Sequence, residues 1–171
     1  MTEQFTLFLK GPLSQWFKGN FVVDGVTYNT AEQYMMAEKA RLFKDEAVLK
    51  KIMEAKDPWD QKDLGRDVKP FVEKDWNKVA RDVVYKGNWH KFKQVKKFRE
   101  KLDATKGTTL VEVNPKDKIW GVGLAEDDSR ALKRESWLGT NWLGEVLTKV
   151  REDLALDKYT TKDFGWSGKE D

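Results

Sequence analysis

The pattern of apolar and polar positions marks three short β-type segments. Residues 5–9 form an apolar run that a Gly-Pro pair ends, as expected for a strand followed by a turn. Residues 21–28 contain two β-rich runs around Asp24-Gly25, which is the form of a β-hairpin. Residues 108–113 predict a further strand.

Apolar residues spaced three and four positions apart predict helices over most of the remaining chain. The first should begin at Thr30, because Thr30 and Gln33 have the spacing of a capping box. We expect an α+β fold, a mainly helical single domain with a small β-sheet, over residues 1–157, and a polar C-terminal tail over residues 158–171. The predicted helices are 30–43, 45–55, 57–65 with Gly65 as its stop, 75–106 with Asp75 as cap and a bend or interruption at Gly87-Asn88, and 141–154 with Asn141 as cap.

One predicted helix carries two charged residues on its apolar side. At about 100° per residue, Met36 and Phe43 fall within roughly 40° of Glu32. Lys39 returns to within about 20° of the same direction. A carboxylate and an ammonium on a buried face are destabilising unless they are paired or used. Glu32 and Lys39 are therefore site residues, a structural ion pair, or charges that a rotated helix brings to solvent.

Composition narrows the class of protein. Hydrophobic residues make up 39% and charged residues 36% of the 171 positions, as in a soluble chain with a charged surface. No apolar run is long enough to span a bilayer and no secretory leader precedes residue 13, so we expect a cytoplasmic protein without a membrane partner. The absence of cysteine and the single histidine, His90, argue against thiolate sites, Ser-His-Asp triads and multi-histidine metal sites. A net charge of +3 suits an anionic substrate if basic residues converge.

A second candidate carboxylate follows the last predicted strand. Asp117 comes after a proline turn and before the segment Trp120-Gly121-Val-Gly123. An aspartate in this position is ordinarily a turn former. Alternatively, the strand delivers its carboxylate to a pocket, where glycines allow the backbone to approach a ligand closely.

Other polar residues have a structural and a functional interpretation. Arg66 near a helix end favours the helix dipole, or it clamps a phosphate. Asn141 caps a helix, or it holds a ribose hydroxyl. The lysines at positions 93, 97 and 101 form a solvated helix face, or they contact a nucleic-acid backbone.

Short motifs run in a fixed order along the chain: Leu13-Ser-Gln-Trp16, Asp24-Gly25, Thr30-Ala-Glu-Gln-Tyr34, Lys39-Ala40, Leu64-Gly-Arg66, Lys91-Phe92, Leu110-Val-Glu112, Asp117 with Trp120-Gly-Val-Gly123, and Gly139-Thr-Asn-Trp-Leu-Gly144. With these motifs the chain resembles the NADAR family of YbiA-like proteins over about residues 13–154. Two features depart from some bacterial members: Gln15-Trp16 replaces Asn-Phe, and the polar loop 125–136 is long. Both are expected at the pocket mouth, where they bear on the substrate.

The resemblance implies an N-glycosidase that hydrolyses a ribose C1′–N bond. Its implied partners are ADP-ribose attached to guanine, in a nucleotide or in ADP-ribosylated DNA, and phosphorylated ribosylamino-pyrimidine intermediates of riboflavin synthesis. No metal or cofactor is implied. The residues that the resemblance places at the site are Glu32, Asp117 and Lys39 for catalysis, and Arg66, Trp89 or Trp120, Gly121 and Asn141 for substrate binding.

The chemistry leaves two mechanisms and three functions open. Loss of the nitrogen develops positive charge on ribose, which Glu32 can stabilise while a second carboxyl assists the leaving group. Alternatively, Lys39 attacks the opened sugar aldehyde and forms a transient Schiff base. The first function is the N-riboside hydrolase. The second is a module that binds ADP-ribose or a nucleotide without cleaving it. The third is a repair enzyme whose affinity for modified DNA falls steeply with salt.

Overall fold

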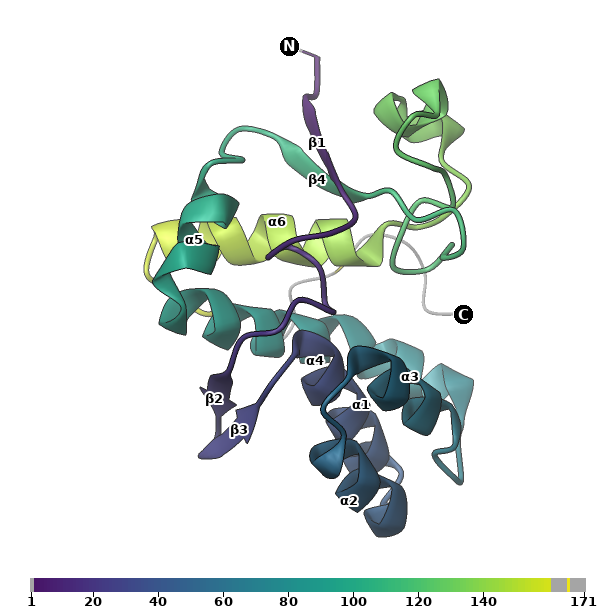
Figure 1. Ribbon diagram of the computed structural model, residues 1–171. Helices are drawn as coiled ribbons and strands as arrows, with labels where there is room; N and C mark the ends of the chain where they lie inside the picture. Colours follow the sequence, from purple (N-terminus) through teal and green to yellow (C-terminus); the bar gives the residue numbers. More distant parts are fainter. Residues whose placement is uncertain (1, 161–165, 167–171) are drawn as a thin grey trace.

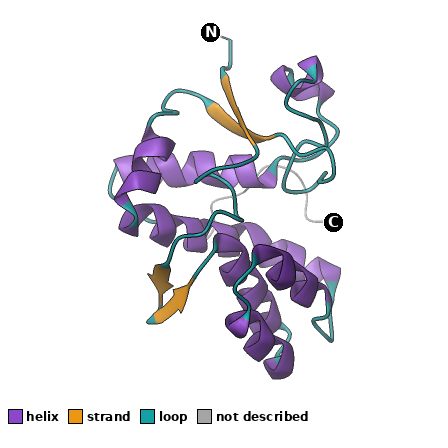
Figure 2. Cartoon of the chain, in the orientation of Figure 1, coloured by secondary structure: helices purple, strands orange, loops and turns teal. Residues whose placement is uncertain are grey.

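The computed structural model describes residues 2–160 and 166, and this part of the chain is mainly helical (Figure 1, Figure 2). The expected α+β class is confirmed, although the strands form two two-stranded sheets. Positions 161–165 and 167–171 of the predicted tail lie outside the described residues. The elements are β1 (Phe5–Phe8), β2 (Phe21–Val23), β3 (Val26–Tyr28), α1 (Ala31–Leu42), α2 (Glu46–Glu54), α3 (Pro58–Arg66), α4 (Glu73–Gln94), α5 (Lys96–Asp103), β4 (Thr109–Glu112), the 3-10 helices η1 (Ser129–Leu132) and η2 (Arg134–Ser136), and α6 (Trp142–Ala155).

The elements stack in layers around two central helices (Figure 1). α4 and α6 pack side by side, and β4 packs on α6 while pairing with β1. α1 packs on α4 and also contacts α2 and α3. Buried apolar side chains from these helices form the core, and they include Tyr34, Val84, Leu143 and Leu147.

The two sheets have different topologies. β1 and β4 run parallel, with Phe8 opposite Glu112 at the end of the ladder. β2 and β3 form the predicted antiparallel hairpin. Its turn residues Asp24 (φ 50°) and Gly25 (φ 80°) both adopt the left-handed conformation that a tight hairpin turn of this type requires. The parallel pair brings the end of β4 beside the segment that follows β1.

α1 begins at the predicted cap. The Thr30 hydroxyl accepts the N–H of Gln33 at 2.9 Å and donates to Gln61 of α3 at 2.6 Å. The Gln33 side chain reaches back to the N–H of Asn29 at 2.7 Å, one residue earlier than an ideal capping box. These bonds fix the first turn of α1, and with it Glu32, relative to α3.

Two glycines expected to end or interrupt helices lie inside them instead. α3 continues through Gly65, where a Cβ would come within 2.0 Å of Met36 Sδ. α4 continues through Gly87, where a Cβ would lie 2.4 Å from a ring carbon of Tyr34. Both glycines permit close packing against α1, which sequence periodicity does not reveal.

The helical segment predicted over residues 75–106 is two helices. α4 begins at Glu73 without a side-chain cap, so the prediction of Asp75 as cap is wrong. α4 ends at Gln94, and Val95 separates it from α5. Lys93 therefore lies on a different helix from Lys97 and Lys101, and the predicted single basic face is not formed.

The remaining connections are short helical turns and docked segments. The polar loop 125–136 is mostly exposed, as expected, and contains η1 and η2. After α6 the chain returns to α4, where the N–H of Thr160 donates to Tyr85 Oη at 3.0 Å and Trp166 Nε1 donates to Asp82 at 2.8 Å. Within the described residues, no helix has both the length and the apolar character required for a bilayer crossing.

Candidate active site

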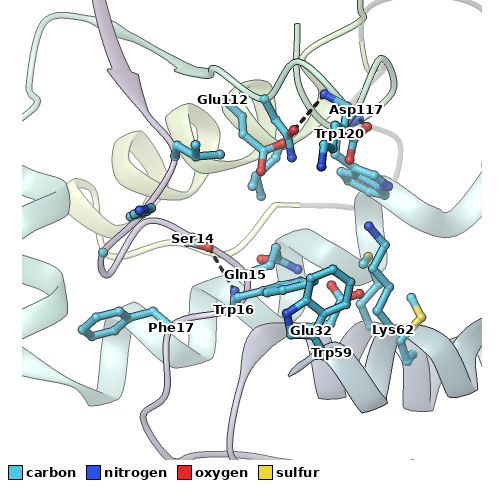
Figure 3. Close-up of a pocket in the computed structure, with 18 of the residues that line it drawn as sticks. Ser14, Gln15, Trp16, Phe17, Glu32, Trp59, Lys62, Glu112, Asp117 and Trp120 are labelled. Atoms are coloured by element: carbon cyan, nitrogen blue, oxygen red, sulfur yellow. Dashed lines mark hydrogen bonds between the residues drawn. The ribbon is translucent and has the colours of Figure 1, made fainter. Parts of the chain in front are cut away.

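A cavity of about 650 Å³ lies between α1, α3, the loop after β1 and the segment after β4 (Figure 3). A volume of this order is typical of sites for small molecules and cofactors. Three of the predicted catalytic or basic residues (Glu32, Lys39 and Arg66) reach it from the helices. In Figure 3, Glu112, Asp117 and Trp120 form one wall, and Trp16, Glu32, Trp59 and Lys62 lie across from them.

Glu32 supplies a buried carboxyl from the first turn of α1. Its side chain lines the cavity although the residue is only 4% exposed. Its N–H donates to the Gln15 carbonyl at 2.9 Å, which joins the helix to the cavity loop. Burial raises the pKa of Glu32 to about 7, with Lys62 and Lys39 opposing the rise and Asp117 adding to it. A carboxyl that titrates near neutral pH suits proton transfer or charge stabilisation.

Lys39 reaches the same cavity from the next turns of α1. Its Nζ lies 4.5 Å from the centre of the Phe71 ring. Within the described residues it makes no ion pair with Glu32, so the structural-ion-pair interpretation of the sequence is not supported. Burial lowers the pKa of Lys39, and the charge of Glu32 opposes this shift. A lowered pKa increases the fraction of neutral, nucleophilic amine.

Two further cations of α3 border the cavity. Lys62 places its Nζ 5.7 Å from the centre of the Trp16 ring, and its charge acts on the carboxyl of Glu32. Arg66 is exposed and pairs with Asp63 at 3.2 Å. An exposed pair of this kind contributes little to stability, so Arg66 can exchange its partner for a phosphate at low cost.

Asp117 is both a turn former and a cavity residue. Its Oδ1 accepts the N–H groups of Ile119 at 2.9 Å and Trp120 at 2.8 Å. Its carbonyl accepts the N–H of Gly123 at 3.0 Å. The side chain also borders the cavity. One carboxylate oxygen is therefore committed to the turn, and the other is left for a ligand.

Glu112 is a buried cavity carboxyl that the sequence analysis did not select as a site residue. It ends β4, is 9% exposed and lines the cavity. Burial raises its pKa to about 8, and the charges of Asp117 and Glu32 add to the rise. In the sequence, Glu112 follows three residues of a strand, and nothing in a strand pattern shows that its side chain enters a pocket.

Aromatic rings form the mouth and one wall of the cavity. Trp16 and Trp59 lie edge to face with ring centres 5.0 Å apart, and Trp59 is 62% exposed. Trp120 borders the cavity and packs edge to face on Trp142 at 5.6 Å. Indole rings in such positions are platforms for flat bases. The expectation that residues 15–16 border the pocket is confirmed, whereas the loop 125–136 contributes no lining residue.

The side-chain amide of Gln15 has a fixed orientation at the cavity. Asn88 Nδ2 donates both to the Val84 carbonyl and to Gln15 Oε1, each at 2.8 Å. Only an amide N–H can donate to Val84, so Gln15 must present its oxygen to Asn88. Gln15 Nε2 is buried and has no partner among the described residues. Gln15 also borders the cavity.

Trp89 and Gly121 do not line the cavity. Trp89 Nε1 donates to the Lys158 carbonyl at 3.0 Å, on the surface where the chain returns to α4. Of the two predicted aromatic candidates, the structure therefore brings Trp120 to the cavity and leaves Trp89 outside it. A Cβ at Gly121 would lie 3.0 Å from the Asp117 carbonyl and 3.1 Å from Glu112 Oε2. This glycine permits close packing behind the two wall carboxyls.

Asn141 also lies outside the cavity and acts as a clamp on β4. It is 2% exposed and adopts a left-handed conformation with φ 55°. Its Oδ1 accepts the N–H of Glu112 at 3.0 Å, and its Nδ2 donates to the Leu110 carbonyl at 2.9 Å. Asn141 occupies the predicted N-cap position of α6, where its carbonyl accepts the N–H of Glu145 at 3.0 Å, but its side chain makes no capping hydrogen bond to the first turn of this helix. Its connection to the site runs through the backbone of Glu112.

Replacing Asn141 with alanine is expected to lower stability rather than to weaken substrate binding alone. The change leaves the Leu110 carbonyl and the Glu112 N–H buried without partners, which should lower the free energy of unfolding by about 2–4 kcal/mol in total. Urea unfolding measures this loss. The exposed Asn20→Ala change is the control and should stay within about 0.5 kcal/mol of the parent. Unchanged stability with a raised KM would contradict the clamp and favour a direct substrate contact.

The site combines two carboxyls that titrate near neutrality with cations and aromatic rings. This set can bind a phosphorylated, base-containing ligand and can move protons at its centre. Within residues 2–160 and 166, no three acidic or histidine side chains are grouped to hold a metal ion. Sequence reasoning missed Lys62 and Trp59 as well as Glu112. The sequence signal of Lys62 and Trp59 was weak, because these two residues lie on a short amphipathic helix, where exposed charged and aromatic residues are common.

Comparisons with known proteins find similarity over most of the chain. A family model described as the NADAR domain matches residues 6–155. N-glycosidase R617 of Acanthamoeba polyphaga mimivirus is 43% identical over 145 residues, which cover 82% of this chain and 85% of that protein. N-glycosidase YbiA of Escherichia coli (strain K12) is 32% identical over 148 residues, covering 86% and 84%. The NMR structure of the E. coli protein YbiA matches with a TM-score of 0.75 at 29% identity, covering 95% of this chain and 93% of that chain.

Proposed function

The chain belongs to the NADAR domain family, and on this premise we propose that it removes ADP-ribose from guanine, in a nucleotide or in DNA. The reaction class is hydrolysis of an N-glycosyl bond, as in the relatives that are named N-glycosidases. Phosphorylated ribosylamino-pyrimidine intermediates of riboflavin synthesis contain the same type of ribose C1′–N bond and are a second proposed substrate class. These compounds are nucleotides or their precursors, so the proposed place of action is the cytoplasm.

The observation that carries the proposal is the pair of buried carboxyls, Glu32 and Glu112, on opposite walls of one cavity (Figure 3). Cleavage of a glycosidic bond develops positive charge on the sugar, and two carboxyl groups that flank the bond are the usual means of catalysis. Burial raises the pKa of both groups into the range where protons are exchanged near neutral pH. Neither group is explained by a structural ion pair in the described residues.

The remaining lining residues support a phosphorylated ligand with a flat base. Lys39, Lys62 and Arg66 place three positive charges along one side of the cavity, suited to one or two phosphates. Trp59, which is exposed, and Trp16, which is half-buried, line the cavity with their rings edge to face. The volume of about 650 Å³ is ample for an ADP-ribosyl group.

Two chemical routes are compatible with these residues. In direct hydrolysis, the Glu32 carboxylate stabilises the cationic sugar and guides water to C1′. In the second route, the sugar ring opens to an imine between C1′ and the base nitrogen, the Lys39 amine adds to C1′ and displaces that nitrogen as the free amine, and water hydrolyses the resulting lysine Schiff base. The lowered pKa of Lys39 makes the second route accessible, and borohydride trapping of a covalent adduct distinguishes it from the first.

The test of the proposal is product analysis by mass spectrometry. The protein is incubated with ADP-ribosylated guanosine monophosphate, with the same modified base in DNA, and with a ribosylamino-pyrimidine phosphate. Release of free ADP-ribose with unmodified guanine supports the first substrate class, and release of ribose 5-phosphate supports the second. Ligand-dependent thermal stabilisation without product on prolonged incubation contradicts hydrolysis and indicates a binding module. Activity on DNA that falls with salt, beside salt-insensitive activity on the nucleotide, separates backbone contacts from recognition of the modified base.

Replacing Trp59 with alanine is expected to raise KM about tenfold with little change in kcat, since stacking on a base contributes ~1–3 kcal/mol. Stability should change little, because Trp59 is 62% exposed. Steady-state kinetics on ADP-ribosylated guanosine monophosphate measures the effect. The matched control is Trp89→Ala, whose ring lies outside the cavity and should leave KM unchanged. Equal KM values for all three proteins would remove Trp59 from the binding site.

A further inference from the structure

The backbone of Glu112 is fixed from three directions. The parallel ladder pairs it with Phe8 of β1. Its N–H donates to Asn141 Oδ1 at 3.0 Å, and its carbonyl accepts the N–H of Val122 at 3.0 Å. The carboxyl therefore projects from a rigid point on the cavity wall (Figure 3). Rigid placement of this kind is what a group acting on a substrate requires.

The carboxyl of Glu112 is placed as a neutral acid. Oε2 is buried without a hydrogen-bond partner among the described residues, packed against the backbone of Gly121. This leaves Oε1 as the oxygen that a ligand in the cavity can reach. An ionised carboxylate so placed would be strongly destabilised, whereas the protonated form is tolerated. Burial accordingly raises the pKa of Glu112 to about 8, with Asp117 and Glu32 adding to the rise and Lys62 opposing it.

Glu32, across the cavity, has a different electrostatic environment. The charges of Lys62, Lys39 and Arg66 all favour its ionised form against the effect of burial, and its pKa rises only to about 7. Three cations therefore favour the ionised form of Glu32, whereas at Glu112 only Lys62 opposes the effect of burial. Two carboxyls that their environments hold in different protonation states can act as base and acid in one site.

We propose that Glu112 is the catalytic acid that protonates the departing nitrogen, a task that the sequence alone would give to Asp117. This inference rests on the proposed function and on its direct hydrolysis route. As the C1′–N bond breaks, its electron pair remains on nitrogen, which takes the proton of the Glu112 carboxyl. Water adds to C1′ and gives a proton to the Glu32 carboxylate. Solvent then accepts that proton and returns one to Glu112.

Asp117 is less suited to this task for a geometric reason. Its Oδ1 accepts two backbone N–H groups of the turn, so rotation of the carboxyl would break both bonds. It remains positioned to hold the turn and to contribute negative charge near the sugar. Glu112 has no such competing bonds on its side chain within residues 2–160 and 166.

The test is the pH profile of Glu112→Gln on ADP-ribosylated guanosine monophosphate. Glutamine keeps the size of the side chain and an N–H donor but cannot release a proton. We expect kcat to fall about 10²-fold with KM nearly unchanged, the smaller end of what a general acid contributes. We expect kcat/KM of the wild type to decline at alkaline pH as Glu112 loses its proton, and this decline should be absent from Glu112→Gln. Glu112→Asp keeps an acid and should keep this decline at a lower rate, and the exposed Glu126→Gln is the control with both parameters unchanged.

The possible outcomes separate this inference from the proposed function. An alkaline decline that persists in Glu112→Gln, or a kcat close to that of the wild type, overturns the role of Glu112 while leaving the reaction established. If Glu112→Gln does not fold, the pH profiles of kcat/KM for the wild type and for Glu112→Asp provide the test. Absence of an alkaline decline in either profile overturns the role of Glu112 as the acid. A wild type that releases no product from any of the substrates contradicts the proposed function instead.

Discussion

Replacing Glu32 with glutamine is expected to lower kcat about 10³-fold, because the change removes the carboxylate that faces the developing sugar cation. The acid-side rise of kcat/KM should vanish with it. Burial raises the pKa of Glu32 to about 7, so wild-type activity increases as this group ionises towards neutral pH. Kinetics between about pH 5 and pH 9 with ADP-ribosylated guanosine monophosphate measures both effects.

The same change should stabilise the fold. A carboxyl whose pKa is raised on folding contributes stability that is complete below its unfolded pKa and is lost as pH rises through its folded pKa. Above about pH 7 the wild type therefore bears the cost of a buried charge, about 3 kcal/mol from the shift of Glu32, which glutamine avoids. Glu38→Gln on the same helix, where Glu38 pairs with Arg41 at 3.0 Å, is the control with activity retained. Turnover by Glu32→Gln at the wild-type rate would refute the assignment.

Replacing Lys91 with methionine is expected to stabilise the protein by about 3 kcal/mol near pH 7. Lys91 is fully buried, and within the described residues no carboxylate pairs with it. Its Nζ donates to the Ser14 carbonyl at 3.1 Å and otherwise lies over the rings of Phe92 and Phe98, at 5.0 and 5.7 Å. Methionine fills similar space without the charge. Chemical unfolding of the two proteins measures the difference.

The pH dependence identifies the cause of this stabilisation. Burial lowers the pKa of Lys91 to about 7, so above that pH the folded protein has released a proton that the unfolded chain still holds. In the wild type this group makes the free energy of unfolding rise by about 1.4 kcal/mol per pH unit, from pH 8 towards pH 10. Lys91→Met should lose this contribution. Lys93, two positions along the helix, is exposed and pairs with Asp157, so Lys93→Met should keep the wild-type dependence of the unfolding free energy on pH. Equal dependence on pH in the two variants would contradict burial of Lys91 as the cause.

The sequence predicted those features of the fold that depend on local chemistry. The hairpin turn needs left-handed conformations that Asp24 and Gly25 provide, and the start of α1 needs the hydroxyl of Thr30. Features that depend on contacts between distant elements were not predictable. Gly65 and Gly87 look like helix breakers in the sequence, whereas in the fold they make room for side chains of α1.

The candidate site divides in the same way. Glu32 and Lys39 were identified because charges on an apolar helix face violate periodicity, and that signal is local. Glu112 gave no such signal, since its side chain enters the cavity only because β1 pairs with β4. Asn141 is the predicted N-cap residue, but the role of its side chain was not predictable for a related reason: that side chain bonds the Leu110 carbonyl and the Glu112 N–H, about thirty positions away, and not the first turn of α6.

The parallel pairing of β1 with β4 also has a consequence for the order of folding. Thr6 and Thr108 share a hydrogen bond of 2.7 Å across 102 positions, whereas the contacts within α1, α2 and α3 join near neighbours in the chain. Closing so long a loop loses entropy before its contacts form, so pairings of this kind are slow. We expect the helices to form early and the wall that carries Glu112 to be added late. Helical content would then return during refolding before catalytic competence does.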